Sequence, residues 1–111
     1  MHAYAPYSKF AVGAALRPEG TLEPVMGVNV ENASFGMTSC AERNAVFTAV
    51  TAGHRRFDVI AVHADAETAS PCGACRQVLA EFAPDITVVY RRQGEVVAAG
   101  LDELLPERFA L

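Results

Sequence analysis

Three cysteines, in two separate segments, are the residues of this sequence best able to do chemistry. Cys72 and Cys75 lie in SPCGACRQVLAEF with two residues between them, and Cys40 lies in TSCAERNAV. Taken alone, a C-x-x-C pair fits a redox pair, a structural clip or a metal site, and a single cysteine is often a small buried apolar residue. Together the three cysteines match the three protein ligands typical of a catalytic zinc, whose fourth position holds water, whereas structural zinc sites usually have four protein ligands.

The residues around Cys40 fit hydrolytic zinc chemistry. Cys40 and Cys72 each fall at a predicted helix N-terminus, where unpaired N–H groups and the helix dipole favour a thiolate. Zinc can lower the pKa of bound water from 15.7 to about 7, and hydrolysis then needs a proton carrier. Glu42, in the first turn of the predicted helix, is placed for this role, although acidic residues are favoured there without any function. Arg43 falls on the same helical face as Cys40 and would offset the charge of three thiolates, unless it is a plain surface residue.

The three histidines are less suitable as ligands than the cysteines. His2, His54 and His63 are expected at the terminus, at the surface and on a strand. The arrangement C-x-E followed by P-C-x-x-C is therefore the informative signal, because it is far more specific than any of its parts.

The pattern of apolar residues, turns and caps predicts the elements that must position these groups. Strands are expected over residues 9–17, 25–31, 57–64, 85–92 and 95–101. Helices are expected over 40–53 with Ser39 as the cap and over 71–82 with Pro71 in the first turn. The last segment, 101–109, should contain a short helix that ends at Pro106. The first two strands form a hairpin, and the later strand–helix–strand order favours parallel pairing. We expect one α/β domain over residues 1–111, a three-layer α/β/α sandwich around a mixed sheet of about five strands.

Composition narrows the class of protein. The net charge is −4, and there is no Lys/Arg cluster beyond two short pairs, which disfavours binding to nucleic acid. No apolar run approaches the roughly 18 residues of a membrane span. With three cysteines and no sign of secretion, a reducing, cytoplasmic location is expected.

Five segments together give the sequence a resemblance to a known family. AYAPYSKFAVGAAL, GVNVENASFG, CAERNAV, SPCGACRQVLAEF and LLPERF occur in an order that resembles the small, all-cysteine zinc cytidine deaminases, from Ala3 to Phe109. The resemblance implies hydrolytic deamination of cytidine and deoxycytidine to uridine and deoxyuridine, with release of ammonia, in pyrimidine salvage. It implies one Zn²⁺ per chain, held by Cys40, Cys72 and Cys75, with Glu42 moving protons.

The same resemblance implies how a free nucleoside and neighbouring subunits would contact the chain. Asn29 and Glu31, two apart on a predicted strand, would hold the ribose hydroxyls, and the carboxylate would repel a phosphate. Phe10 would pack on the pyrimidine, and Ala41 would contact the base through its backbone. In a homotetramer with shared sites, the positions that would reach a neighbouring subunit's site are Ala33, Phe35 and Phe109.

Two features depart from the family pattern. The chain begins almost at AYAPYSKF, without the helix that usually precedes it, which puts packing over the sheet or between subunits in question. Phe35 stands where tyrosine is common, and the lost hydroxyl should weaken nucleoside binding by about 0.5–1.5 kcal/mol.

Other functions are compatible with parts of the sequence. The nearest is deamination of another aminopyrimidine nucleoside, such as a blasticidin-type antibiotic. A nucleic-acid deaminase is disfavoured by the net charge of −4. A zinc-stabilised structural module would need a fourth protein ligand, and a thiol oxidoreductase would leave Cys40 and Glu42 without a role.

Overall fold

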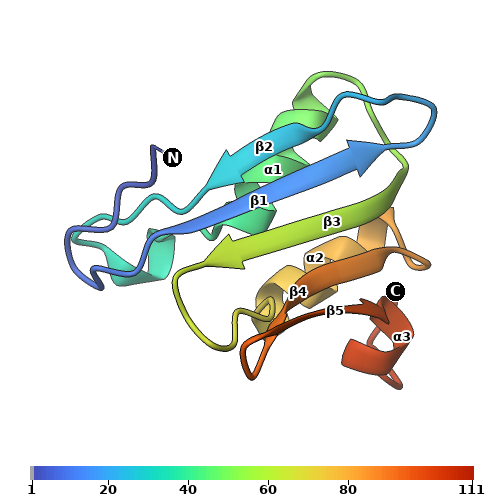
Figure 1. Ribbon diagram of the computed structural model, residues 1–111. Helices are drawn as coiled ribbons and strands as arrows, with labels where there is room; N and C mark the ends of the chain where they lie inside the picture. The colour runs from blue at the N-terminus through green and yellow to red at the C-terminus, as the bar shows by residue number, and fades with distance from the viewer. Residues whose placement is uncertain (1) are drawn as a thin grey trace.

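The computed structural model describes residues 2–111, which form a five-stranded mixed sheet with helices packed against it (Figure 1). The strands are β1 (Val12–Pro18), β2 (Val25–Val28), β3 (Phe57–Ala64), β4 (Thr87–Arg92) and β5 (Glu95–Gly100). The helices are the 3₁₀ turn η1 (Phe35–Met37), α1 (Ala41–Thr51), α2 (Gly73–Phe82) and α3 (Leu101–Leu104).

The strand order is β2-β1-β3-β4-β5. The hairpin β1–β2 is antiparallel, β1 also pairs antiparallel with β3, and β4 pairs antiparallel with β5. Only β3 and β4 are parallel among the described strands, and α2 connects them. The predicted hairpin, the strand–helix–strand crossover and the mixed α/β sheet are confirmed.

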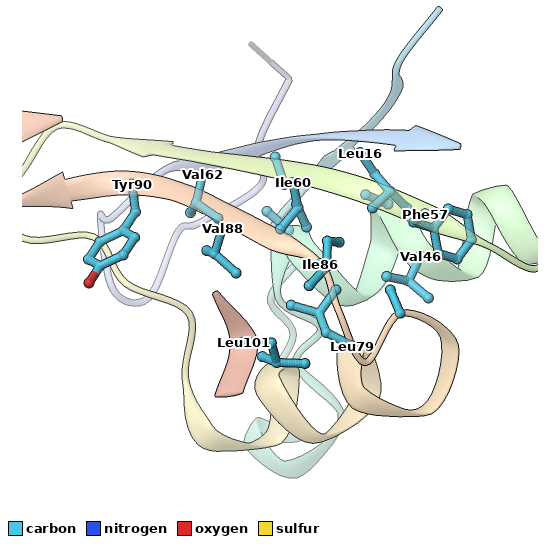
Figure 2. Close-up of a cluster of buried hydrophobic side chains, with 14 of the residues drawn as sticks. Leu16, Val46, Phe57, Ile60, Val62, Leu79, Ile86, Val88, Tyr90 and Leu101 are labelled. Carbon is cyan, nitrogen blue, oxygen red and sulfur yellow. The ribbon is translucent and has the colours of Figure 1, made fainter. Parts of the chain in front are cut away.

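A single apolar core lies between the sheet and the helices. Strand residues on one face of the sheet alternate with less buried residues on the other, so Leu16, Ile60 and Val88 are fully buried. They pack in one cluster with Val46 of α1 and Leu79 of α2, and Figure 2 shows these side chains converging from both layers. In Figure 1 both α1 and α2 lie behind the sheet. The core therefore forces the two helices onto the same face.

The opposite face of the sheet is not covered by the residues that the structure describes. It carries a hollow of about 550 Å³ whose lining includes Gly13, Ala15, Ala61 and Val89. Of the three layers that were expected, residues 2–111 thus form two. None of their helices is both long enough and apolar enough to cross a membrane.

Several predicted boundaries were wrong, each for a local reason. Helix α1 has Cys40 rather than Ser39 at its N-cap, and the Ser39 hydroxyl donates to Asn44 Oδ1 instead. Helix α2 begins at Gly73, so Pro71 precedes the helix. Strand β2 ends at Val28, three residues earlier than predicted, because Val30 pairs in single bridges with Tyr4 and Ser39.

The remaining strands and the last helix show smaller differences of the same kind. Strand β1 begins at Val12 rather than Lys9, β4 begins at Thr87 rather than Asp85, and β5 ends at Gly100. Helix α3 is a single turn that ends at Leu104, before Pro106.

Helix α1 packs unusually close to strand β2, and Gly27 makes this approach possible. A Cβ atom at Gly27 would lie 2.3 Å from the carbonyl oxygen of Ala41 and 2.5 Å from the backbone nitrogen of Ala45. Real Cβ atoms do not approach backbone this closely, so any side chain at Gly27 would push away the first turns of α1. The same turns carry Cys40 and Glu42.

Replacing Gly27 with alanine should therefore destabilise the fold. We expect Gly27→Ala to lower the free energy of unfolding by about 1–3 kcal/mol, the usual cost of overpacking, as measured by urea denaturation. Gly36→Ala is the matched control, because nothing lies within 4 Å of a Cβ at that position. Equal stability of the two variants would contradict the close packing of α1 on β2.

Candidate active site

The three cysteines come together where the N-termini of α1 and α2 meet. Cys40 is the N-cap of α1, Cys72 is the N-cap of α2, and Cys75 lies in the first turn of α2. The Sγ atoms of Cys40 and Cys72 are 4.0 Å apart, and those of Cys72 and Cys75 are 3.4 Å apart. These separations show that the thiols face one another.

The thiol cluster fits a zinc ion. All three Sγ atoms lie within 4.8 Å of one another. In a tetrahedral site with Zn–S bonds of 2.3 Å, sulfurs are about 3.8 Å apart, close to the separations of 4.0 and 3.4 Å found here. Zinc would thus be held by three sulfurs and would keep a fourth position for water, as in catalytic rather than structural sites.

The thiols of Cys72 and Cys75 differ in how readily they ionise. Partial burial opposes ionisation of Cys72, but hydrogen bonds from the Cys75 N–H and from the thiols of Cys75 and Cys40 outweigh burial and lower its pKa. Burial raises the pKa of Cys75 strongly, and the nearby Glu42 carboxylate raises it further. The two thiols therefore differ in how easily they lose a proton, and a bound cation would favour the thiolate form of both.

Glu42 is a buried carboxyl beside this cluster. Its side chain is 5% exposed, on the first turn of α1. Burial raises the pKa of Glu42, and its own backbone N–H, the Cys75 thiol and Arg43 only partly oppose this effect. A carboxyl whose pKa is raised by burial holds a proton more readily than an exposed one, which suits a general acid–base group.

Arg43 makes the contact with the cluster that the spacing predicts. Its Nη2 donates to Cys40 Sγ at 3.1 Å and to the carbonyl oxygen of Thr38 at 3.4 Å. The guanidinium therefore places positive charge next to a sulfur that faces the metal position.

A pocket of about 270 Å³, here called the central pocket, opens above the cluster. A second hollow of about 380 Å³, the side pocket, adjoins it and shares Ser8, Glu31 and Thr38 with it. A larger hollow, on the other face of the sheet, contains none of the predicted site residues. Seven of the predicted site residues line the central pocket: Phe10, Asn29, Glu31, Cys40, Ala41, Glu42 and Cys72.

Asn29 and Glu31 hold the segment that closes the central pocket. Asn29 Oδ1 accepts from the Val12 N–H at 3.0 Å, and its Nδ2 donates to the carbonyl oxygen of Phe10 at 2.8 Å. Glu31 Oε1 accepts from the N–H groups of Tyr7 and Ser8, at 3.0 and 3.1 Å. Both residues line the pocket, but neither lies on a strand, so they are not placed by the strand face that the sequence predicted.

Three predicted positions lie apart from the central pocket within this chain. Phe35 is 71% exposed, lines the side pocket and packs edge-on against Tyr7 at 5.4 Å between ring centroids. Ala33 is exposed in the same loop. Phe109 is 68% exposed beside α2, where its carbonyl oxygen accepts from Gln77 Nε2 at 2.9 Å.

Sequence reasoning missed three residues that fix the site. Ser8 hydrogen-bonds to Glu31, and Asn44 Nδ2 donates to the carbonyl oxygen of Val28 at 2.7 Å, which ties α1 to β2. Arg76 donates to the carbonyl oxygens of Pro71, at 2.8 Å, and of Leu104, at 2.6 Å. Their only signal was their position inside the segments AYAPYSKF, CAERNAV and SPCGACRQV.

The fold and the site define a zinc-binding α/β domain with a buried carboxyl beside its thiol cluster, and known proteins share the fold and the zinc-binding region. Residues 1–91 match the family model described as the cytidine and deoxycytidylate deaminase zinc-binding region. A cytidine deaminase of Halalkalibacterium halodurans is 50% identical over 96% of this chain and 83% of its own.

Solved structures and a second type of relative extend the comparison. The crystal structure of a cytidine deaminase from Burkholderia pseudomallei is similar with a TM-score of 0.90 and 47% identity, over 97% of this chain and 88% of that one. A blasticidin-S deaminase of Bacillus cereus is less similar, at 33% identity over 92% of this chain and 79% of its own. The chain belongs to the cytidine and deoxycytidylate deaminase zinc-binding family.

Zinc should stabilise the protein through the thiol cluster. We expect one zinc per chain to raise the thermal midpoint of unfolding, because the ion binds the folded state. Cys72→Ala should weaken zinc affinity by at least about 100-fold, the upper range for loss of an outer-shell partner, as measured by competition with a chromophoric chelator. Affinity equal to that of the parent would exclude Cys72 as a ligand.

Stability at low pH should depend on Glu31. The hydroxyl of Ser8 and the N–H groups of Ser8 and Tyr7 lower the pKa of Glu31. Its contribution is complete above the ordinary glutamate pKa of about 4.3 and is lost as the pH falls through the lower, folded-state value. In urea unfolding of the metal-free protein, the parent should lose stability on acidification more steeply than Glu31→Gln.

An exposed carboxylate provides the control for this experiment. Glu19→Gln removes the same charge at an exposed position. It should follow the parent, whereas parallel pH curves for the parent and Glu31→Gln would show that Glu31 contributes nothing.

Proposed function

We propose that the protein catalyses the zinc-dependent hydrolytic deamination of cytidine and deoxycytidine to uridine and deoxyuridine, with release of ammonia. The observation that carries this proposal is the buried Glu42 beside three clustered thiols at the base of a pocket of about 270 Å³. Membership of the deaminase family and the names of the relatives support it.

The metal would be held by Cys40, Cys72 and Cys75. When bound, zinc lowers the pKa of water at its open position and so supplies the nucleophile for C4 of cytosine. The Arg43 guanidinium, hydrogen-bonded to Cys40 Sγ, offsets part of the thiolate charge and keeps the site electrophilic. The N-termini of α1 and α2 act in the same direction.

Glu42 would move the protons of the reaction. Burial raises its pKa, so the carboxylate accepts a proton readily and holds it in a site shielded from solvent. It would deliver one proton to N3 of the ring and a second to the departing amino group. General acid–base catalysis of this kind contributes about 10²–10⁴ in rate.

The pocket walls would orient the nucleoside. Phe10 is 42% exposed at the pocket and would pack on the pyrimidine, while the buried backbone of Ala41 would contact the base. The Asn29 side chain uses one acceptor position of Oδ1 and one hydrogen of Nδ2 for bonds to the protein backbone. One acceptor position and one donor hydrogen of the amide therefore remain for the sugar. Glu31 would accept from a sugar hydroxyl.

Charge favours a free nucleoside over a phosphorylated or polymeric substrate. A Glu31 carboxylate at the sugar end of the pocket would repel a phosphate, and the chain has a net charge of −4. A blasticidin-type nucleoside is the alternative substrate. The lower identity of the blasticidin-S deaminase relative makes cytidine the better choice.

The assembly and the setting are also part of the proposal. We infer a homotetramer of single-domain chains, 1–111, in which Ala33, Phe35 and Phe109 reach sites in neighbouring subunits. Exposed apolar side chains support such contacts: Tyr7, Phe35, Met37, Phe47 and Phe109. Pyrimidine salvage in the cytoplasm is the setting that such a nucleoside deaminase would serve.

Removing the carboxyl of Glu42 should abolish turnover without disturbing the site. Glu42→Gln keeps the side-chain size, so we expect the variant to bind one zinc and to unfold cooperatively. Its rate of ammonia release from cytidine should fall by about 10²–10⁴.

The matched control is Glu81→Gln, which removes an exposed carboxyl from the same fold. Glu81→Gln should deaminate cytidine at the parent rate. A Glu42→Gln variant that also does so would overturn the proton-transfer role of Glu42.

A further inference from the structure

The sugar end of the central pocket contains one side chain whose hydrogen bonds run in a fixed direction. The hydroxyl of Ser8 lies between two groups, donating to Glu31 Oε2 and accepting from the N–H of Phe10 at 3.1 Å. Ser8 lines both the central pocket and the side pocket. It therefore connects the carboxylate at the sugar end with the backbone of the aromatic residue at the base end.

The direction of these bonds follows from donor and acceptor chemistry. A backbone N–H can only donate, so the Ser8 oxygen must accept from Phe10 and its single proton must go to Glu31. Glu31 is thereby held as an acceptor-only carboxylate. Its Oε1 already accepts two N–H groups and its Oε2 accepts the Ser8 hydroxyl, which leaves one acceptor position on Oε2.

The backbone around Ser8 also needs this support. Lys9, between Ser8 and Phe10, has a φ of 60°, a left-handed conformation that is unfavourable for a residue with a side chain. The Lys9 N–H donates to the carbonyl oxygen of Ala5 at 3.0 Å, and the two N–H groups of Tyr7 and Ser8 are bound by Glu31. The hydrogen bonds of Ser8 hold the turn on either side of Lys9.

We propose that Ser8 is a positioning and specificity-determining residue for the nucleoside, a role that rests on the proposed function. It orients Glu31 so that the remaining acceptor position on Oε2 meets a hydrogen-bond donor of the sugar. The substrate group that contacts Glu31 must be a hydroxyl that donates a hydrogen bond. An acceptor or an anion at that position would be repelled, because the Glu31 carboxylate has no proton to donate.

The test compares substrates with and without sugar hydroxyls. For the zinc-loaded Ser8→Ala variant, we expect the KM for cytidine to rise roughly tenfold, the effect of losing one hydrogen bond to a charged group. The value of kcat should change much less, because the hydroxyl of Ser8 is bound to Glu31 and to the Phe10 N–H and not to Glu42, to which the proton transfers are assigned. For 2′,3′-dideoxycytidine, which lacks both ring hydroxyls, the KM should change by less than about twofold.

Two further variants separate this role from general damage to the fold. Ser8→Thr keeps the hydroxyl and should restore most of the affinity for cytidine. Thr51→Ala removes a hydroxyl that donates to the carbonyl oxygen of Phe47 at the far end of α1, and it should leave the KM for both nucleosides unchanged. An equal rise in KM for cytidine and dideoxycytidine, a fall confined to kcat, or no change in KM would each overturn the proposal.

Binding measurements distinguish failure of this proposal from failure of the proposed function. Calorimetric titration of Glu42→Gln, with and without Ser8→Ala, reports affinity without turnover. If the parent does not deaminate cytidine but Ser8→Ala still selectively weakens cytidine binding, the role of Ser8 stands and the proposed reaction fails. If Glu42→Gln binds cytidine and dideoxycytidine with equal affinity, the role of Ser8 is wrong.

Discussion

The packing of α1 and α2 on the same face of the sheet is the constraint on which the site depends. A helix N-terminus has unpaired N–H groups and a partial positive charge, so two such ends normally avoid each other. Here both are pinned by the core, in which Val46 and Leu79 pack against the same strands. Gly27 lets α1 approach β2 closely enough for its first turn to reach that of α2. Thiolates at this junction relieve the repulsion, and a cation binds them.

Charge balance then determines what the junction can do. Three thiolates and a zinc ion have a net charge of −1, which would make the ion a weak Lewis acid. Arg43 and the two helix dipoles compensate for this charge from behind the sulfurs. On the pocket side, Glu42 is buried, and desolvation raises its pKa more than Arg43 lowers it. Under the proposed function, the same few residues would therefore tune both the metal and the group that exchanges protons.

Local sequence patterns were enough to predict the elements and the clustered ligands. The apolar runs of β3 and β4 and the end of α2 at Phe82 follow from composition and periodicity. The cysteine spacing predicted a cluster because helix N-termini were expected at both segments. The choice of cap at α1 was wrong, since serine is favoured at an N-cap, yet Ser39 binds Asn44 and the thiol of Cys40 occupies the cap position. Capping preferences alone do not take into account that the metal site requires a cysteine thiol at this position.

Contacts between segments distant in sequence were beyond prediction. Glu31 takes its donors from Tyr7 and Ser8, 24 and 23 residues earlier in the chain. No period or propensity encodes such pairing, which arises only when the hairpin brings Val30 beside Tyr4. The number of layers was also not predictable, because a strand has the same apolar sequence pattern whether helices cover one face of the sheet or both.

The most direct test of the central claim is the rate of ammonia release from cytidine as zinc is added to metal-free protein. If three thiolates hold a zinc with an open position, the rate should rise in proportion to bound zinc and level off at one ion per chain. A metal-free protein that is already active, or a fully loaded protein that releases no ammonia, would contradict it.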